Sequence, residues 1–588
     1  MAASPAEIRE MIAGILEIPA GSLPDTLGVG DVPQWDSLAQ MAIMTTLEDE
    51  CGLSVPEERM MELSTIGQII AFAGGGGVPP APAAEPAPAA ECSRAAGAFA
   101  DTPAAPALPA YNRQPVVLTI QQRADEHPAK AAIVFEHDAV TYRQLVLGMR
   151  SAAAYLRQKG VKPGDVVALY AEKTKEFYHC YFGAHLMGAA VLNLDASTKE
   201  ERLNYVFGQT HPALCLGSGL KADARFDEIG LEQFAPDTEL AAPPMEAVAD
   251  IMFTTGTTGE PKGVPLTHAN LAAAAWQINS FIGTCADDVE VLALPICHSF
   301  GMGRSRCVLA AGGTLVPVPG FSNPKRLFAA MDQYRATGLA FVPAAWAYLQ
   351  KMSGDALAAH AASLRYIEIG SAAMDTATRR HLMELFPLTR ICMHYGLTEA
   401  SRSAFIEFHS QSGHLDSAGL PAPHVQISIL SPEGTPVQTG EEGEICIKGD
   451  HVVAAYLNQP AAACRHGEYF RTGDWGMLDA DGYLHVLSRT KDIINTGGKK
   501  VSPDEVEGIL CSIPGVAEAA CVPAPDPQGV LGEVVRAVLV SDGTPHPTDA
   551  TLRAAVATQA EAYKVPAVIE WRDSLPKTES GKLQRRLV

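Results

Sequence analysis

TTGTTGEPKG, residues 254 to 263, lies between the apolar run IMF at 251 to 253 and the helix-like stretch HANLAAAAWQ at 268 to 277. Its first six positions hold four threonines and two glycines (Thr254, Thr255, Gly256, Thr257, Thr258 and Gly259), and Lys262 follows them. Backbone N–H groups and hydroxyls in such a loop can surround phosphate oxygens. The loop lacks the Gly-Lys-Ser/Thr ending of a Walker A sequence. It therefore predicts phosphate binding between a strand and a helix, and a plain Gly/Thr turn is the alternative.

Strand-like and helix-like segments alternate on both sides of this loop. The apolar runs are DVVALYA (165 to 171), AVLNL (190 to 194), VLALPIC (291 to 297), LAFVP (339 to 343) and YIEIG (366 to 370), and EFYHCYFGAHLMGAA (176 to 190) is helix-like. This alternation predicts α/β layers with a parallel sheet. Near residue 489 a charged strand-turn-helix segment begins, and two strand-like runs follow it, so we expect a domain boundary there.

Length and composition limit the class of protein. A chain of 588 residues exceeds the roughly 250 to 300 residues that one core supports, so three or four domains are expected. The net charge of −23 argues against a nucleic-acid partner. Charged residues at 7, 9 and 10 interrupt any signal peptide, and no run is long enough to span a membrane. The twelve cysteines form no CxxC pair, which is typical of a cytoplasmic protein with reduced thiols and no metal cluster.

Four further motifs follow the Gly/Thr loop: HYGLTEAS (394 to 401), YFRTGDWG (469 to 476), SRTKDIINTGGKKVSPDEVE (488 to 507) and LPKTESGK (575 to 582). In this order they resemble the adenylate-forming superfamily of acyl-CoA synthetases, carrier-loading adenylation domains and luciferases. The resemblance covers roughly 111 to 588. It implies a large α/β domain of layered sheets and helices with a β subdomain at 111 to 488, and a small mobile α+β domain at 489 to 588. It also implies ATP-dependent activation of a carboxylate as an acyl-AMP, followed by transfer to a thiol.

The same resemblance implies roles for individual residues. Glu399 would bind Mg²⁺ on the phosphates of ATP, and Thr398 would contact the α-phosphate. The adenine would be flanked by Gly370, Ser371, Ala372, Ala373, Tyr395 and Gly396. Asp474 would accept hydrogen bonds from the ribose hydroxyls with help from Arg489, and Lys582 would stabilise charge that develops on carboxylate and phosphate oxygens. The alternatives are solvated loop acids at 399 and 474, and a mobile tail cation at 582.

The segment near 489 resembles the hinge about which the family's C-terminal domain swings. Lys491 occupies the hinge position, and an ordinary exposed lysine is the alternative. Some relatives carry a lysine four residues later that aids thiol transfer, and here that residue is Asn495, so the role is unfilled or reassigned. Ser488 replaces the Gly or Asp that is common before the arginine, a change that we expect to matter little.

CHSFGM, residues 297 to 302, resembles the segment that lines the family's acyl pocket. His298 matches the residue that gates access of the thiol, and a core or helix-capping histidine is the alternative. Arg304, Arg306 and Arg402 raise a further question. Each could pair with a second carboxylate or polar group on the acid, or face solvent or a local acidic partner. The acid itself stays open among fatty, aryl and dicarboxylic acids.

The N-terminal 73 residues predict a small helical domain with helices near 5 to 18, 37 to 51 and 64 to 73. It holds 12 acidic residues against 2 arginines. WDSL (35 to 38) resembles the attachment site of an acyl carrier protein, a four-helix bundle, and Ser37 matches the serine that receives 4′-phosphopantetheine. A helix N-terminus suits the phosphodiester, but Asp36 or Ser37 could equally be an unmodified N-cap. Residues 74 to 110, with 8 Pro and 14 Ala, predict a linker.

Together these features favour an ATP- and Mg²⁺-dependent enzyme that loads a carboxylic acid onto the phosphopantetheine thiol of its own carrier domain. A rival hypothesis is transfer to free CoA, with the carrier used in a later step. A rival of another class is an inactive carrier scaffold, against which Glu399, Asp474 and Lys582 argue. The family's light-producing branch is disfavoured by the carrier domain. The expected partners are a phosphopantetheinyl transferase, which would modify Ser37, and downstream acyl-accepting enzymes.

Overall fold

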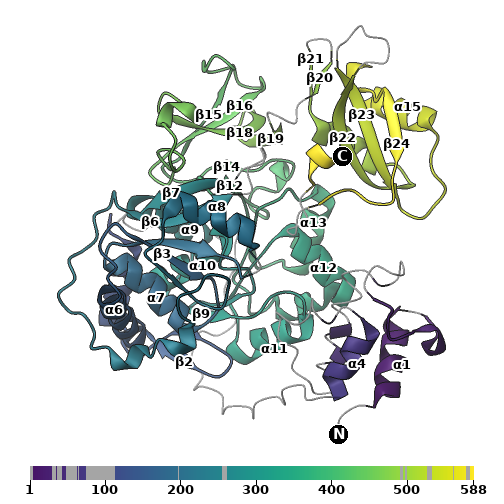
Figure 1. The fold of residues 1–588 in the computed structure, drawn as a ribbon. Helices are drawn as coiled ribbons and strands as arrows, with labels where there is room; N and C mark the ends of the chain where they lie inside the picture. Colours follow the sequence, from purple (N-terminus) through teal and green to yellow (C-terminus); the bar gives the residue numbers. More distant parts are fainter. Residues whose placement is uncertain are drawn as a thin grey trace.

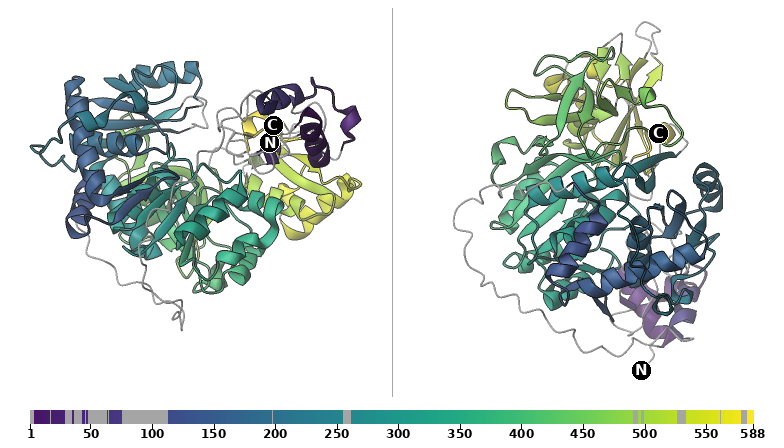
Figure 2. Two further views of the ribbon diagram at one scale, coloured as in Figure 1. Left: turned by 90° about the horizontal axis from the view of Figure 1, so that it is seen from below. Right: turned by 90° about the vertical axis from the view of Figure 1, so that its left-hand side faces the viewer.

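The structure is a computed structural model (Figure 1). It describes residues 4–16, 18–28, 35, 43–44, 46–47, 63, 65–74, 113–196, 198–254, 261–489, 494–496, 499–525, 533–560, 562–577 and 583–588. Three bodies follow one another along the chain: N-terminal helices, a large layered domain and a small C-terminal domain (Figures 1 and 2). The multidomain architecture expected from the sequence is confirmed.

The N-terminal body contains α1 (Pro5–Leu16) and α4 (Ile66–Gly74). Both helices contribute to one small apolar core, and Trp35, Ile43, Met44 and Leu47 are fully buried in it. Met44 and Leu47 lie within the segment where a helix is expected at 37 to 51, and most of that segment lies outside the described residues. Trp35 anchors the chain in this core two residues before Ser37, which is itself outside the described residues.

Two sheets form the frame of the large domain in the described part of the chain. The first has the strand order β14 (Leu420–Pro421), β13 (Ala400–Glu407), β12 (Arg390–Leu397), β11 (Tyr366–Ile369), β10 (Gly338–Phe341), β8 (Val289–Leu292), β9 (Thr314–Pro317), β1 (Ala131–Val134) and β2 (Ala139–Thr141). The second has the order β5 (Leu214–Leu216), β3 (Val166–Tyr170), β4 (Ala190–Leu194), β6 (Val248–Thr254) and β7 (Lys262–Thr267). Strands β12, β11, β10, β8, β9 and β1 run parallel, as do β5, β3, β4 and β6, which confirms the predicted parallel character.

Helices cover both faces of each sheet. Between the sheets lie α5 (Val116–Glu126), α6 (Tyr142–Gln158), α7 (Lys175–Leu186), α9 (His268–Ile282) and α10 (Ser299–Ala311), whose buried residues form one cluster with the inner sheet faces. Helix α8 (Glu200–Thr210) packs on the outer face of the second sheet. The outer face of the first carries α11 (Pro324–Tyr334), α12 (Pro343–Ser353) and α13 (Thr376–Leu385). Parallel strands buried on both faces explain the continuous apolar runs in the sequence.

The Gly/Thr loop differs from its sequence-based prediction. It does not join a strand directly to a helix, because β6 is followed by β7, which pairs antiparallel with it from Val248↔Thr267 to Thr254↔Lys262. Helix α9 begins only after β7, where Thr267 caps it through a capping box with Asn270. The prediction failed because KGVPLT, with its partly alternating burial, pairs with β6 before the cap begins. The loop is therefore the end of a hairpin.

A third, antiparallel sheet forms the expected β subdomain, with β15 (Gln426–Leu430), β16 (Gly443–Lys448), β18 (Tyr469–Leu478), β17 (Arg465–His466) and β19 (Leu484–Arg489). The C-terminal domain holds β20 (Ile494–Thr496), β21 (Lys499–Val501), α14 (Pro503–Cys511), β22 (Val516–Pro525), β23 (Glu533–Ser541), α15 (Asp549–Gln559) and β24 (Val568–Trp571). Its helices and strands share one core, as expected for a separate α+β unit. Among the described residues, no helix is both long enough and apolar enough to cross a bilayer.

Candidate active site

The carboxyl ends of the parallel strands bring the predicted site residues together. Strand β11 ends just before Gly370, β12 just before Thr398, and β6 just before the Gly/Thr loop. Ligands of open α/β sheets bind outside this edge of the strands. The edges of the two sheets meet where the Cys297 thiol donates to Asp195 Oδ2 over 3.4 Å, since Asp195 follows β4.

Asp474 and Tyr395 form the first element of the site. The Tyr395 hydroxyl donates to Asp474 Oδ2 over 2.7 Å, and Asp474 is only 5% exposed. In the β18–β19 ladder, the backbone of Arg489 lies directly opposite Asp474. The Arg489 side chain lies outside the described residues. Asp474 is therefore not a solvated loop acid but a carboxylate held in place by a phenol.

Glu399 is the centre of a second element. The Tyr456 hydroxyl donates to Glu399 Oε1 over 2.7 Å, and Glu399 is 5% exposed. The Lys262 ammonium lies 4.7 Å from the centre of the Tyr456 ring, which is a cation–π geometry. Tyr456 thus connects Lys262, near the end of the Gly/Thr loop, to the acid of the HYGLTEAS motif. Sequence reasoning missed Tyr456, because a lone tyrosine in VVAAYLNQP carries no local signal of this contact.

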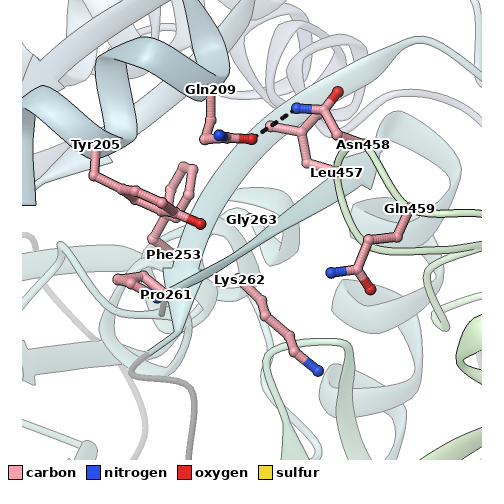
Figure 3. Close-up of a pocket in the computed structure, with 9 residues that line it drawn as sticks. All are labelled: Tyr205, Gln209, Phe253, Pro261, Lys262, Gly263, Leu457, Asn458 and Gln459. Carbon is pink, nitrogen blue, oxygen red and sulfur yellow. Dashed lines mark hydrogen bonds between the residues drawn. The ribbon is translucent and has the colours of Figure 1, made fainter. Parts of the chain in front are cut away.

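A cavity of about 330 Å³ lies beside the base of the Gly/Thr hairpin (Figure 3). It is lined by Tyr205, Gln209, Phe253, Pro261, Lys262, Gly263, Leu457, Asn458 and Gln459. Asn458 donates to Gln209 across it over 2.9 Å, and the Lys262 side chain points away from this pair. The ammonium of Lys262 is consequently directed toward Tyr456 and away from the Gln209–Asn458 pair.

The backbone of the turn after β11 packs closely against His394 at Gly370 and is exposed at the next two residues. A Cβ atom at Gly370 would lie 2.0 Å from the ring of His394, so only glycine fits there. Ser371 has a φ of +73°, an unusual conformation for a residue other than glycine. Ser371 and Ala372 are exposed. A tight turn with an exposed face can receive a flat ring without having to expel side chains.

His298 lies at the N-cap position of α10 and is exposed, and its side chain makes no capping hydrogen bond. It is neither a core histidine nor a side-chain cap, the two alternatives open from sequence. Its ligand atom, that of Cys297 and that of Asp195 lie within 4.8 Å of one another. Burial, the largest cause, and Asp195 raise the pKa of the Cys297 thiol, which keeps this sulfur protonated at neutral pH.

The arginines of the acyl-pocket segment have acidic partners within the protein. Arg304 is fully buried and donates to both oxygens of Glu290, at 2.9 Å and 3.1 Å from its Nε. Arg306 donates to Asp250 over 2.6 Å. Burial alone would raise the pKa of Asp250, but Arg306 and His185 hold it below its usual value. Of the alternatives that the sequence left open for these two arginines, the structure shows the local acidic partner.

Several predicted residues lie outside the described residues: Ser37, Thr255, Gly256, Thr257, Thr258, Gly259, Lys491 and Lys582. The chain on either side of Lys582 is described. Lys577 and Leu583 form a β-bridge, and Arg585 is paired with Asp504 and Glu507 on α14. Burial, the largest cause, raises the pKa of Glu507 to about 7. The tail beyond residue 582 is thereby attached to the C-terminal domain.

Three family models match separate parts of the chain. Residues 120–457 match the AMP-binding enzyme family, 505–582 the AMP-binding enzyme C-terminal domain, and 6–73 the phosphopantetheine attachment site. The chain belongs to the AMP-binding enzyme family. It is accordingly an acid–thiol ligase that forms an acyl-AMP, fused to a phosphopantetheine carrier domain.

Individual members of the AMP-binding enzyme family resemble the chain over most of its length. A feruloyl-CoA synthase of an Amycolatopsis species is 32% identical over 500 residues, which are 79% of this chain and 96% of the relative. An oxalate–CoA ligase of Arabidopsis thaliana is 30% identical over 474 residues, 75% of this chain and 90% of the relative. The solved structure of Bacillus subtilis o-succinylbenzoate coenzyme A synthetase with ATP and magnesium ion superposes with a TM-score of 0.72 at 28% identity, covering 80% of this chain and 99% of that one.

Proposed function

We propose that this AMP-binding enzyme activates a carboxylic acid as an acyl-AMP and transfers the acyl group to the phosphopantetheine thiol of its own carrier domain. The observation that carries the proposal is the presence of both parts in one chain: a phosphopantetheine attachment match at 6–73 and an AMP-binding match at 120–457. Ser37 would be the attachment residue. We further propose domain limits of 1–73, 111–488 and 489–588, with a linker at 74–110.

The described side chains suit ATP and Mg²⁺. Two buried carboxylates are each oriented by a tyrosine: Glu399 follows the carboxyl end of β12, and Asp474 lies within β18, where Tyr395 of β12 reaches it. A hard divalent cation prefers such oxygen ligands, and ribose hydroxyls require acceptors. Glu399 would hold Mg²⁺, which would neutralise phosphate charge when bound. Asp474 would hold the ribose, and the exposed turn at Ser371 and Ala372 would receive the adenine.

Other residues would act on the phosphates and the thiol. Thr398 would donate to the α-phosphate, and Lys262 and the Gly/Thr loop would hold the outer phosphates. Lys582 would stabilise charge as a carboxylate oxygen bonds to the α-phosphorus and pyrophosphate leaves with the electrons of the broken P–O bond. In the second half-reaction, a thiol sulfur bonds to the acyl carbon, AMP leaves, and the thiol proton is released. His298, exposed at the start of α10, would gate that thiol, and Lys491 would be the hinge between the two half-reactions.

The linker supports transfer within the chain. The linker has 37 residues and joins the carrier to the adenylating domain. A flexible connection presents the tethered carrier to the active site at an effective concentration of about a millimolar. Loading of the chain's own carrier can therefore outcompete a second carrier that binds weakly.

The second candidate, transfer to free CoA, is favoured by a different observation: the curated relatives are named as CoA synthases and ligases, and 96% of the feruloyl-CoA synthase is covered. Buried, hydrogen-bonded carboxylates at 399 and 474 argue against an inactive scaffold.

The two acceptors can be separated with Ser37→Ala. Protein produced with a phosphopantetheinyl transferase is incubated with ATP, Mg²⁺, CoA and a panel of acids, and three quantities are measured: ATP–pyrophosphate exchange, the intact mass of the chain and the acyl-CoA formed. We expect the Ser37→Ala variant to retain exchange and to lose the mass increase from acylation. Ser64→Ala, another serine of the same domain, is the matched control and should retain both. If Ser37→Ala changes neither exchange nor product, and acyl-CoA is the product in every variant, the carrier-loading proposal is wrong.

A further inference from the structure

Arg402 is a buried arginine near the residues of the proposed site, and the proposed chemistry gives it no role. It lies near the start of β13, is 2% exposed and has a φ of +56°. Its Nε donates to Glu368 over 3.0 Å, and its Nη2 donates to the carbonyl of Phe300 over 3.2 Å. The guanidinium thus joins the HYGLTEAS hairpin to strand β11 and to the first turn of α10.

Two further large side chains pack around this guanidinium. The Phe300 ring lies 4.8 Å from the Arg402 guanidinium and 4.9 Å from the ring of His394, which it meets edge-on. His394 in turn contacts Glu368, with 2.9 Å between Nδ1 and Oε1. A Cβ at Gly303 would lie 2.6 Å from Nη1 of Arg402, so the guanidinium lies directly against α10. We refer to Arg402, Phe300 and His394 together as the Arg402 plug.

The residues of the Arg402 plug are close neighbours in sequence of three residues of the proposed site. Phe300 is two residues after His298, His394 adjoins Tyr395, and Arg402 is three residues after Glu399. These site residues come from the three segments that the plug joins. An acid that placed its carboxylate at the α-phosphate near Thr398 and extended between α10 and strands β11 to β13 would meet side chains of the plug, which join these elements.

The charges around the plug are balanced without a ligand. The two guanidinium groups of Arg304 and Arg402 face the two carboxylates of Glu290 and Glu368, and all four residues are at most 2% exposed. Burial alone would raise the pKa of Glu368, but Arg402 and Arg304 hold it well below its usual value. Burial lowers the pKa of His394, which keeps this imidazole neutral. The positive charge of these two arginines is therefore already neutralised and does not favour a second carboxylate on the acid.

We propose that the Arg402 plug restricts the enzyme to small monocarboxylic acids, whose carbon chain ends before it reaches the guanidinium. The inference rests on the proposed function, because it concerns the acid that the same site would adenylate. A longer or aryl acid would have to separate Arg402 from Glu368 and from the carbonyl of Phe300. Glu368 and the carbonyl of Phe300 would then be buried without the Arg402 guanidinium as a partner, and a buried polar group that loses its partner costs free energy.

ATP–pyrophosphate exchange across straight-chain acids from acetate to decanoate, with succinate and ferulate added, tests the proposal on the full-length protein. For the wild type we expect kcat/KM to fall at least about tenfold between butanoate and octanoate, since single methylenes are discriminated by about tenfold or more in a closed pocket. Succinate and ferulate should support less exchange than butanoate. Phe300→Ala should raise the octanoate-to-butanoate ratio at least about tenfold.

A second variant removes the guanidinium without leaving a buried charge unpaired. Arg402→Met combined with Glu368→Gln keeps Arg304 paired with Glu290 and should shift the preference to longer acids as well. Phe386→Ala is the matched control, since Phe386 is fully buried in the core on the outer face of the first sheet and should leave the ratio unchanged. Wild-type use of octanoate, ferulate or succinate as efficient as that of butanoate would overturn the plug while the proposed function stood. If none of the acids supported exchange, both the plug and the proposed function would be overturned.

Discussion

Two tyrosines make the same contact to two different carboxylates, and their removal should have separable effects. Tyr395 donates to Asp474 and Tyr456 donates to Glu399, each over 2.7 Å. Both carboxylates are 5% exposed. If Asp474 holds the ribose and Glu399 holds Mg²⁺, Tyr395→Phe should impair use of ATP and Tyr456→Phe should impair use of the metal. Each variant serves as the matched control for the other.

The size of the effect follows from the geometry. A hydrogen bond to a charged group contributes about 1.5 to 3 kcal/mol. We take the lower limit, because Asp474 and Glu399 each have a further interaction besides the hydrogen bond from the tyrosine. Since about 1.4 kcal/mol corresponds to a factor of ten, Tyr395→Phe should raise the KM for ATP about tenfold. Tyr456→Phe should raise the Mg²⁺ concentration needed for half-maximal rate by a similar factor, with the KM for ATP at saturating Mg²⁺ little changed.

The assay is ATP–pyrophosphate exchange with ATP and Mg²⁺ varied independently. A ribose analogue sharpens it: wild type should discriminate against 3′-deoxy-ATP, and Tyr395→Phe should discriminate less, because the acceptor of that hydroxyl is no longer held. Tyr456→Phe should keep the wild-type discrimination. Equal changes of both parameters in both variants, or an unchanged KM for ATP in Tyr395→Phe, would refute the separate roles of the two carboxylates.

Two further predictions concern stability. Burial lowers the pKa of His451 in the folded protein to about 3, whereas the same side chain in the unfolded chain has a pKa of about 6.5. Between these two pH values the unfolded state binds more protons than the folded state, so stability is lost as the pH falls below about 6.5. This site should cost about 2 kcal/mol between pH 7 and pH 5, and urea unfolding of His451→Asn, which lacks the titration, should show a smaller pH dependence; an equal dependence would contradict the assignment. Arg306→Met leaves Asp250 buried without its arginine and should destabilise the protein by about 3 to 5 kcal/mol. Adding Asp250→Asn should restore most of this loss, and a double variant no more stable than Arg306→Met would show that the ion pair is not the cause.

Much of the fold could be predicted because its signals are local. Buried parallel strands leave continuous apolar runs: DVVALYA at 165 to 171 exceeds β3 by one residue at each end, and AVLNL at 190 to 194 coincides with β4. The hairpin of β6 and β7 on either side of the Gly/Thr loop was not predicted, because β7 is defined by pairing with β6 rather than by its own pattern. A strand that depends on a partner has no signal in a short window of sequence.

The sequence by itself determined the class of chemistry: five ordered motifs and WDSL indicated an adenylating enzyme with a carrier domain, because phosphate loops and attachment sites need particular residue types at particular positions. Only the tertiary structure decided which residues meet. Tyr456 reaches Glu399 across 57 positions of the chain, and Arg402 is brought to Phe300 across 102. Such contacts depend on the packing of strands and helices far apart in sequence, and local composition carries no record of them.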